Sequence, residues 1–320
     1  MKRSSPSESN PSQVSSELRK HYFLEQFVVI APKRNLRPES FSHPDQMHKG
    51  PADNCHFCGN REAAIWQTPR GTHWQVKVIG NAYPAFSIDN PDAYGVQEVV
   101  INTPDHNVEF SELGLDHIKD IFEAYRRRLT VLKKVSGIRY VLVFKNDGPM
   151  AGASVAHAHC QIFALPLVPP QIEADTDALN HYWDEHGNCA YCDIVHWELQ
   201  QNSRVIMADK HFAAISPYAS AYPFEVWLIP LTHKTTFTDL SPGELNSLAV
   251  FLKTLTSRLD NASMSFNYFL QESLANQDHH FVIKVEPRTT KWAGAELGTG
   301  ILINPVSPEY ATLWYQNKIK

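Results

Sequence analysis

The stretch GASVAHAHCQIFALP, residues 152–166, places His157, His159 and Gln161 at every second position of a segment that is otherwise suited to a buried strand. In an extended strand, side chains two residues apart point to the same face and lie about 6 to 7 Å from one another. The two imidazoles and the amide therefore share one face, and the opposite face carries small or apolar residues: Ala158, Cys160 and Ile162. The pattern predicts a strand with one side in the core and one side that performs chemistry.

The composition around this strand excludes several classes of protein. The chain has 320 residues, 43% of them hydrophobic, and a formal net charge of -5. That charge disfavours a broad surface that tracks the phosphates of nucleic acid. No apolar run is long enough for a membrane span, and the Ser-rich, Pro-broken residues 1–18 predict a disordered tail rather than a secretory signal. We therefore expect a cytoplasmic protein that partners neither nucleic acid nor membrane.

Four of the five cysteines form two Cys-x-x-Cys pairs, Cys55 with Cys58 and Cys189 with Cys192. Without a secretion signal, such pairs indicate a metal site or a redox couple before a structural disulfide. A redox pair normally opens a helix after a strand, whereas loop-like or mixed sequence follows both pairs here and histidines lie downstream. Paired thiolates plus imidazoles favour closed, tetrahedral zinc sites. The fifth cysteine, Cys160, is predicted to be a small buried residue rather than a nucleophile.

The chain contains the same order of elements twice, which indicates an internal duplication. Each copy begins with a Cys-x-x-Cys pair, continues through a strand, a histidine, a helix and a second strand, and ends at another histidine. In the first copy, after the cysteines, these are residues 96–102, His106, a helix, residues 138–144 and His157. In the second copy they are residues 224–230, His233, a helix, residues 266–271 and His280. Each half is therefore predicted to be an α+β unit of sheet plus helix.

The two helices carry the strongest periodic signal. Apolar residues three or four apart form one stripe in the first helix: Leu115, Ile118, Phe122, Tyr125, Leu129 and Leu132. The second helix opens with Ser241-Pro242-Gly243-Glu244, a capping box with proline at the first helical position. Its stripe consists of Leu245, Leu248, Leu252, Leu255 and Leu259. Each stripe predicts a helix that packs on its own sheet.

The two copies differ on the polar face of the histidine strand. In the second copy Val282 stands in place of His159, and Lys284 stands in place of Gln161. The histidine two residues before each of these pairs is present in both copies. A metal-binding histidine is therefore retained twice, whereas the chemistry is predicted to lie in the first half alone.

Several motifs occur together and in order: the His-x-His-x-Gln strand, the upstream Cys-x-x-Cys pair, TPDH at residues 103–106, and the opening FVVIAPKRNLRP at residues 27–38. Together they resemble the galactose-1-phosphate uridylyltransferase family of the histidine-triad superfamily. The resemblance implies two histidine-triad-like halves, each an antiparallel sheet with a packed helix. The catalytic half is expected over residues 19–176 and the non-catalytic half over residues 177–320.

The resemblance also implies a mechanism and a metal content. His159 resembles the family's nucleophile, which attacks the α-phosphorus of a nucleoside diphosphate sugar and becomes a nucleotidylated histidine. Gln161 is expected to donate an amide hydrogen to a phosphoryl oxygen, and Gly152 and Ser154 to contact the phosphates. Two zinc ions per chain are expected, the first on Cys55, Cys58, His106 and His157 and the second on Cys189, Cys192, His233 and His280.

Other positions match family residues that contact the substrates. Arg34 and Arg37 match arginines near the phosphates, and Asn81 and Asn146 match asparagines that contact the nucleotide. A second group resembles a loop that reads the hexose, which in the family comes partly from the neighbouring subunit of a homodimer: Lys291 and Glu296. The expected partners are therefore a nucleotide sugar, a sugar phosphate and a second copy of the chain.

The exact substrates stay open at this point. The family resemblance implies exchange of a nucleoside monophosphate between UDP-glucose and galactose 1-phosphate. Ala82 replaces the acidic residue that follows the equivalent of Asn81 in many uridylyltransferases, and GNAYPAF at residues 80–86 resembles the related nucleoside diphosphate glucose phosphorylases. The alternative is therefore an ADP-glucose phosphorylase-like adenylyltransferase, or a nucleotide-sugar hydrolase that uses the same histidine. A zinc-ribbon module for nucleic acid is disfavoured. The two cysteine pairs of such a module lie close together in sequence, whereas Cys58 and Cys189 of this chain are 131 residues apart.

Overall fold

A computed structural model describes residues 15–36, 52, 55–58, 63–68, 73–275 and 277–319. Predictions that concern Arg37 and residues 1–14 lie outside these ranges. Strand β1 (Glu17–Lys20) begins within the predicted tail, because Glu17 pairs with Ile30 and the side chain of Arg19 is buried. The chain is therefore already in a strand at Glu17, where the sequence predicted disorder.

The centre of the molecule is a sheet in which ten strands of the described residues run antiparallel to their neighbours. The five strands of the first half are β3 (Trp66–Thr68), β4 (Val76–Gly80), β5 (Val96–Ile101), β6 (Tyr140–Asp147) and β7 (His159–Leu165). The five strands of the second half are β8 (Val205–Ala208), β9 (Phe212–Ile215), β10 (Val226–Pro230), β11 (Phe266–Gln271) and β12 (Val282–Pro287).

The order of the strands confirms the duplication. From one edge to the centre the sheet reads β3-β4-β5-β7-β6, and from the other edge to the centre it reads β8-β9-β10-β12-β11. The two halves meet where β6 pairs with β11, with Asn267 opposite Asn146 and Phe269 opposite Phe144. The fold is therefore α+β, with two antiparallel half-sheets joined edge to edge into one.

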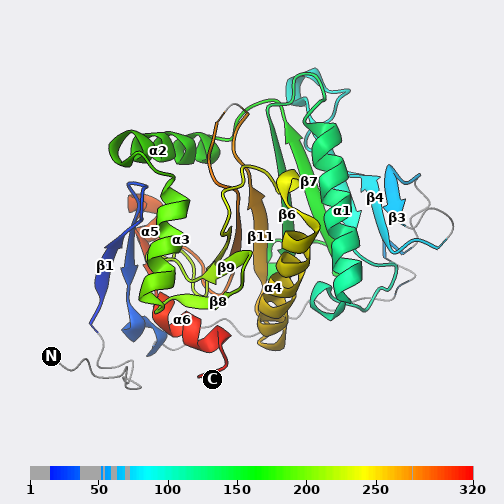
Figure 1. The fold of residues 1–320 in the computed structure, drawn as a ribbon. Helices are drawn as coiled ribbons and strands as arrows, with labels where there is room; N and C mark the ends of the chain where they lie inside the picture. Colours follow the sequence, from blue (N-terminus) through cyan, green and yellow to red (C-terminus); the bar gives the residue numbers. More distant parts are fainter. Residues whose placement is uncertain are drawn as a thin grey trace.

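Helices α1 (Leu115–Leu132) and α4 (Pro242–Asn261) pack on the same face of this sheet and against each other, as Figure 1 shows. Both stripes are buried as predicted, except that Leu115 is 36% exposed at the first residue of α1. The capping box also forms, since Ser241 Oγ accepts from the Glu244 amide and the Glu244 carboxylate accepts from the Ser241 amide. Burial of each leucine contributes about 1.5 to 3 kcal/mol, and the stripes share one core cluster with residues of the sheet.

Two further helices, α2 (Pro170–His186) and α3 (Ala190–Gln201), were not predicted. They cover the opposite face of the second half-sheet, where Trp227, Ile215 and Val282 form a second core with residues of both helices. Because Cys189 is the N-cap residue of α3, the second Cys-x-x-Cys pair opens a helix. The expectation of loop-like or mixed sequence after that pair was therefore wrong. The buried side of α3 is short and includes the polar Glu198, so it gives only a weak apolar stripe in the sequence.

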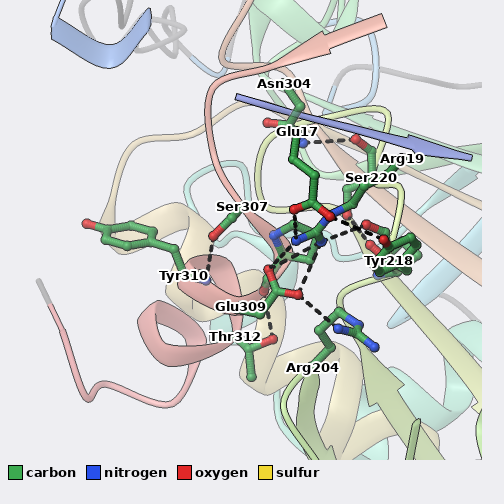
Figure 2. A network of polar contacts seen from close by, with 12 residues as sticks. Glu17, Arg19, Arg204, Tyr218, Ser220, Asn304, Ser307, Glu309, Tyr310 and Thr312 are labelled. Atoms are coloured by element: carbon green, nitrogen blue, oxygen red, sulfur yellow. Dashed lines mark hydrogen bonds and ion pairs between the residues drawn. The ribbon is translucent and has the colours of Figure 1, made fainter. Parts of the chain in front are cut away.

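A smaller sheet ties the beginning and end of the described chain to the second half. It consists of β1, β2 (Phe27–Ile30) and β13 (Leu302–Asn304), in the order β1-β2-β13. Helices α5 (Gly294–Thr299) and α6 (Pro308–Tyr315) flank β13. Figure 2 shows Glu309 of α6 between two arginines, at 3.1 Å from Arg19 Nη1 and 2.8 Å from Arg204 Nη1.

Five short 3-10 helices complete the described elements: Pro32–Leu36, Pro91–Ala93, Phe110–Glu112, Pro149–Ala151 and Phe237–Asp239. Among the described residues, none of the helices is both long enough and apolar enough to cross a membrane.

Candidate active site

The loop between β6 and β7 carries the candidate phosphate contacts. It leaves β6 at Gly148, makes a 3-10 turn over Pro149–Ala151 and turns again at Gly152 before β7 begins at His159. Gly148 and Gly152 have φ of +80° and +81°, a conformation that favours glycine. A Cβ on Gly148 would also lie 2.2 Å from Ser265 Oγ. Both glycines therefore permit the turns of the loop, and Gly148 also lets it approach Ser265, next to the start of β11.

The histidine strand is shorter than predicted. β7 begins at His159, so His157 lies just before the strand rather than in it. From His159 onward the predicted alternation holds, because Cys160 and Ile162 are fully buried and Gln161 is only partly buried on the other face. The ring of His157 is instead fixed by a 2.7 Å hydrogen bond between its Nε2 and the carbonyl of Thr103.

His159 is held in the form that a nucleophile requires. Its Nδ1 lies 2.9 Å from the backbone carbonyl of His157, and because a carbonyl only accepts, Nδ1 carries the proton and Nε2 carries the lone pair. Burial, together with the charge of Lys145, lowers the pKa of His159 to about 4. The imidazole is therefore neutral at pH 7, with Nε2 available to attack an electrophile.

Lys145 is a buried cation behind this histidine that sequence reasoning missed. It lies on the core-facing side of β6, alternating with Val141 and Val143, and is 2% exposed. Its ammonium group donates to the carbonyl of His159 at 3.2 Å and pairs with Asp147 at 3.1 Å. A lysine in the apolar positions of a strand was the signal that could have identified it.

A cavity of about 300 Å³ opens beside His159 and the loop. Its lining includes Asn146, Gly148, Ala153, His157, His159 and Asp260. This volume is at the lower end of the range for small-molecule sites, which are usually concave and carry a few converging polar groups. His159 thus lines a space that is large enough for a small polar ligand.

Asp260 lies at the C-terminal end of α4, in the wall of this cavity. Burial, with the nearby Asp147 carboxylate, raises the pKa of Asp260 to about 7. The folded state therefore keeps a proton that the unfolded chain releases near pH 4, so this group lowers the stability as the pH rises from about 4 to about 7. We expect Asp260→Asn to raise the free energy of unfolding at pH 8 relative to the wild type, by on the order of a few kcal/mol, and to leave it unchanged at pH 4. Urea unfolding at the two pH values measures this, and an unaltered pH dependence would contradict it.

The first cysteine pair joins two histidines in a cluster beside the loop. The ligand atoms of Cys55, Cys58, His106 and His157 all lie within 4.8 Å of one another. Cys58 Sγ lies 3.3 Å from Nδ1 of both histidines, and Cys55 Sγ lies 3.6 Å from His157 Nδ1. The edge of a tetrahedron around zinc with two thiolates and two imidazoles is about 3.6 Å, so this donor set fits a structural zinc ion.

The second cysteine pair forms a matching cluster in the second half. It consists of Cys189, Cys192, His233 and His280, again with all ligand atoms within 4.8 Å of one another. Cys192 Sγ lies 3.4 Å from Nδ1 of each histidine. Nε2 of His233 faces the Asp278 carboxylate at 3.2 Å, the kind of outer contact that orients a metal-bound imidazole. The structure therefore contains two Cys/His clusters that could hold a metal ion.

The first cluster touches the candidate nucleophile through one side chain. Phe57 lies between the two cysteines of the pair, and its ring centroid is 5.0 Å from that of His159 and 5.8 Å from that of His157. The cysteine loop thus packs edge-on against the imidazole that would react.

The chain matches two family models. One describes the N-terminal domain of galactose-1-phosphate uridyl transferase and matches residues 69–169, and the other describes its C-terminal domain and matches residues 175–288. It is 32% identical over 323 residues to ADP-glucose phosphorylase of Arabidopsis thaliana, covering 92% of this chain and 91% of that protein. It is 28% identical over 323 residues to galactose-1-phosphate uridylyltransferase of Thermotoga maritima, covering 92% and 96%.

The chain belongs to the galactose-1-phosphate uridylyltransferase family. Solved structures agree with this. The crystal structure of an ADP-glucose phosphorylase from Arabidopsis thaliana with bound ADP-glucose gives a TM-score of 0.83 at 30% identity, over 96% of this chain and 99% of that one. A uridylyltransferase structure gives a TM-score of 0.75 at 27% identity, over 94% and 97%.

The remaining family positions fall in four places. Arg34 lies in the 3-10 helix that follows β2, and Asn81 follows β4, where its Oδ1 accepts from the Tyr83 amide. Ser154 is exposed in the loop before His159, and Lys291 is exposed before α5. Glu296 is buried, and its carboxylate accepts from the Ala293 amide at the start of α5. This cap of α5 explains the burial of Glu296. Contacts of the residues named in this paragraph with substrate stay predictions.

In the second half, the strand face that corresponds to the polar face of His159 and Gln161 is covered by packed side chains. Val282 is fully buried in the core beneath α2 and α3. Lys284 is 9% exposed, lies over the ring of Trp227 and faces Asp175 of α2 at 3.7 Å. The side chains that replace the histidine and the glutamine therefore build a core.

We therefore expect that Val282→His combined with Lys284→Gln creates no second active site. Helices α2 and α3 cover Val282 in a packed core, and the segment before His280 has no glycine to seat phosphates. The two changes are made in a His159→Ala background, which is incubated with nucleotide sugars and analysed by intact mass. Nucleotidylation at position 282 would contradict the expectation.

Proposed function

We propose that the protein is a nucleotidyltransferase that moves a nucleoside monophosphate between a nucleotide sugar and a sugar phosphate through a covalent bond to His159. The observation that carries the proposal is the state of this imidazole. Its Nδ1 proton is bonded to the His157 carbonyl, which leaves the lone pair on Nε2, and His159 lines a cavity together with residues of a glycine-containing loop.

The reaction has two displacements. In the first, Nε2 of His159 attacks the α-phosphorus, a P–N bond forms, and the P–O bond to the sugar phosphate breaks. The sugar phosphate leaves with the electron pair and needs no strong general acid, because the second pKa of a phosphate ester is about 6. In the second displacement, an oxygen of the acceptor phosphate attacks the phosphorus, and the P–N bond breaks to return neutral His159.

Two features of this chain support the charged transition states. Gln161 lies two residues beyond His159 on the same face of β7, from where its amide can donate to a phosphoryl oxygen. Gly152 turns the loop that leads to His159, and Ser154 is exposed in that loop, where it can contact a phosphate. Because phosphoryl transfer depends mainly on position and electrostatic stabilisation, donors without a competing nucleophile suit this step.

We propose UDP-glucose and galactose 1-phosphate as the substrates, in line with the uridylyltransferase relatives. The second candidate is ADP-glucose with phosphate as acceptor, which the 32% identity to the Arabidopsis ADP-glucose phosphorylase favours. Both use the same first displacement. We further propose that zinc occupies both Cys/His clusters and supplies a structural link, with no part in either displacement. A homodimer also stays a prediction.

The test is to incubate the protein with UDP-glucose, UDP-galactose or ADP-glucose and to measure its intact mass. Addition of uridylyl or adenylyl identifies the donor, and peptide mapping locates the modification. The labelled protein is then mixed with galactose 1-phosphate, phosphate or buffer alone. Return to the unlabelled mass only with galactose 1-phosphate supports the first candidate, return with phosphate supports the second, and rapid return in buffer identifies a hydrolase. No label at His159 with any donor would refute the proposed function.

A further inference from the structure

The junction between the two halves contains an asparagine whose polar atoms are all engaged. Asn267 of β11 lies opposite Asn146 of β6 in the strand pair that joins the half-sheets. Its Nδ2 donates to Asn146 Oδ1 at 2.8 Å and to the carbonyl of Ala151 at 2.9 Å. Its Oδ1 accepts from Arg288 Nε at 2.5 Å. One side chain of the second half thus contacts two positions around the loop of the first.

Arg288 determines which way this amide faces. A guanidinium group only donates hydrogen bonds, so the oxygen of Asn267 must face Arg288 and its nitrogen must face the first half. Arg288 is itself fixed, because Nη2 pairs with Glu286 at 2.9 Å and its guanidinium lies 4.1 Å above the ring of Tyr222. The direction of the whole chain of hydrogen bonds is therefore set from the second half.

The orientation of the Asn267 amide in turn determines the orientation of the Asn146 amide. Because the oxygen of Asn146 accepts from Asn267, the group that Asn146 can turn toward a ligand is its NH₂. Asn146 lines the cavity beside His159, where an amide donor suits an anionic phosphate. An Asn146 amide in the reverse orientation would present a carbonyl oxygen to the same phosphate and repel it.

The loop is held by the same strand. Ala151, whose carbonyl accepts from Asn267, directly precedes Gly152. Gly148, at the other end of the 3-10 turn, lies against Ser265, close to the start of β11. The backbone that leads into the candidate phosphate contacts is therefore supported at both ends by one short segment, Ser265–Asn267.

We propose that Asn267, oriented by Arg288, is a positioning residue that the non-catalytic half contributes to nucleotidyl transfer. It turns the NH₂ group of Asn146 toward the substrate phosphates and fixes the loop at Gly152. The inference rests on the proposed function and deepens it: the second half supplies the orientation of a donor in the active site of the first.

The test compares Asn267→Ala and Asn267→Asp with Gln271→Ala. Gln271 lies in the same strand and also donates a side-chain amide hydrogen bond, to Asp175 at 2.7 Å, but at the end of β11 remote from the loop. The readouts are the single-turnover rate constant for nucleotidylation, and the affinity for UDP and ADP by calorimetry. A displaced donor or loop costs on the order of tenfold to a hundredfold in rate, which we expect for Asn267→Ala and not for Gln271→Ala.

Which of the two Asn267 variants loses more rate and affinity distinguishes a positioning role from a packing role. Aspartate keeps the size of asparagine but cannot donate to Asn146, so Asn146 reverses its amide and presents oxygen to the phosphates. We therefore expect Asn267→Asp to lose at least as much rate and nucleotide affinity as Asn267→Ala, with a crystal structure that has Nδ2 of Asn146 against the new carboxylate. A packing role gives the opposite order, with aspartate nearly silent, and would overturn the inference.

Failure of the inference differs from failure of the proposed function. If wild-type protein forms no nucleotidyl-histidine, the proposed function is wrong, and the nucleotide affinities and the orientation of Asn146 in the aspartate variant still decide the inference. If wild-type protein labels normally and both Asn267 variants label within twofold of it, the inference alone is wrong.

Discussion

Replacement of His159 by alanine is expected to abolish covalent labelling by any nucleotide sugar and to reduce turnover by several orders of magnitude. The reason is that, in the proposed mechanism, Nε2 of this imidazole is the atom that forms the P–N bond. The ammonium group of Lys145, which also lines the cavity, is buried and engaged with Asp147 and the His159 carbonyl. Removal of a nucleophile typically costs about a million-fold in turnover. Intact mass after incubation with donor, and steady-state assays, measure the two effects.

His157→Ala is the matched control, because it removes an imidazole two residues away and leaves the nucleophile in place. The hydrogen bond that fixes His159 uses the backbone carbonyl of residue 157, which alanine retains. We therefore expect this variant to lose metal and stability but to label measurably. His159→Gly provides a second control, since it leaves a cavity that can accept a preformed nucleoside 5′-phosphoimidazolide. Ordinary turnover by His159→Ala would show that the nucleophile is assigned wrongly.

The fold was predictable from the sequence where the signal is local. The apolar stripes of α1 and α4 and the capping box at Ser241 depend on residues three or four positions apart, and they form as predicted. The duplication was readable because the same order of cysteine pair, strand, histidine and helix occurs twice. Helices α2 and α3 were missed because few apolar residues carry their packing on the second half-sheet, and polar Asp175, Thr176 and Glu198 share the buried side with them.

The site was predictable only in part, because some of its residues carry a local sequence pattern and others are brought together only by the fold. The eight cysteines and histidines of the two clusters were identified by type and spacing, and the structure brings them together in two groups of four. Asn267 and Arg288 carry no motif, because their importance depends on the pairing of β6 with β11. The link between Arg19 and Glu309 joins opposite ends of the described chain, and such contacts leave no local pattern.

The start of β7 shows how a cluster overrides a local pattern. The alternating pattern predicted that His157 lies within the strand. Its ring instead contacts Cys55 and Cys58 through Nδ1 and the Thr103 carbonyl through Nε2. The backbone therefore bends before His159, and the carbonyl of residue 157 becomes the acceptor for His159 Nδ1. The departure from the predicted strand is thus what fixes the tautomer of the nucleophile.

That dependence leads to the second large effect, expected from loss of metal at the first cluster. Cys58→Ser removes a donor that lies 3.3 Å from both histidine ligand atoms, so we expect the metal content to fall from two zinc ions per chain to one. Binding of structural zinc contributes about 10 to 16 kcal/mol in small peptides, and its loss should release His157 and Phe57 together. Because Phe57 packs on the His159 ring and residue 157 supplies its acceptor, labelling should fall at least tenfold. Metal analysis, labelling rate and hydrogen exchange over residues 152–165 measure these changes.

Cys192→Ser is the matched variant in the second cluster, where Cys192 Sγ makes the same two contacts with His233 and His280. It is also expected to lose one metal ion, and its increased hydrogen exchange should lie in α3 and near β12 instead of the loop before His159. Its labelling rate should stay close to that of the wild type, because no residue of that cluster contacts His159 among the ring pairs and hydrogen bonds of the described residues. Equal losses of labelling in the two variants would show that metal acts on global stability alone. Retention of both metal ions in Cys58→Ser would remove the first zinc site altogether.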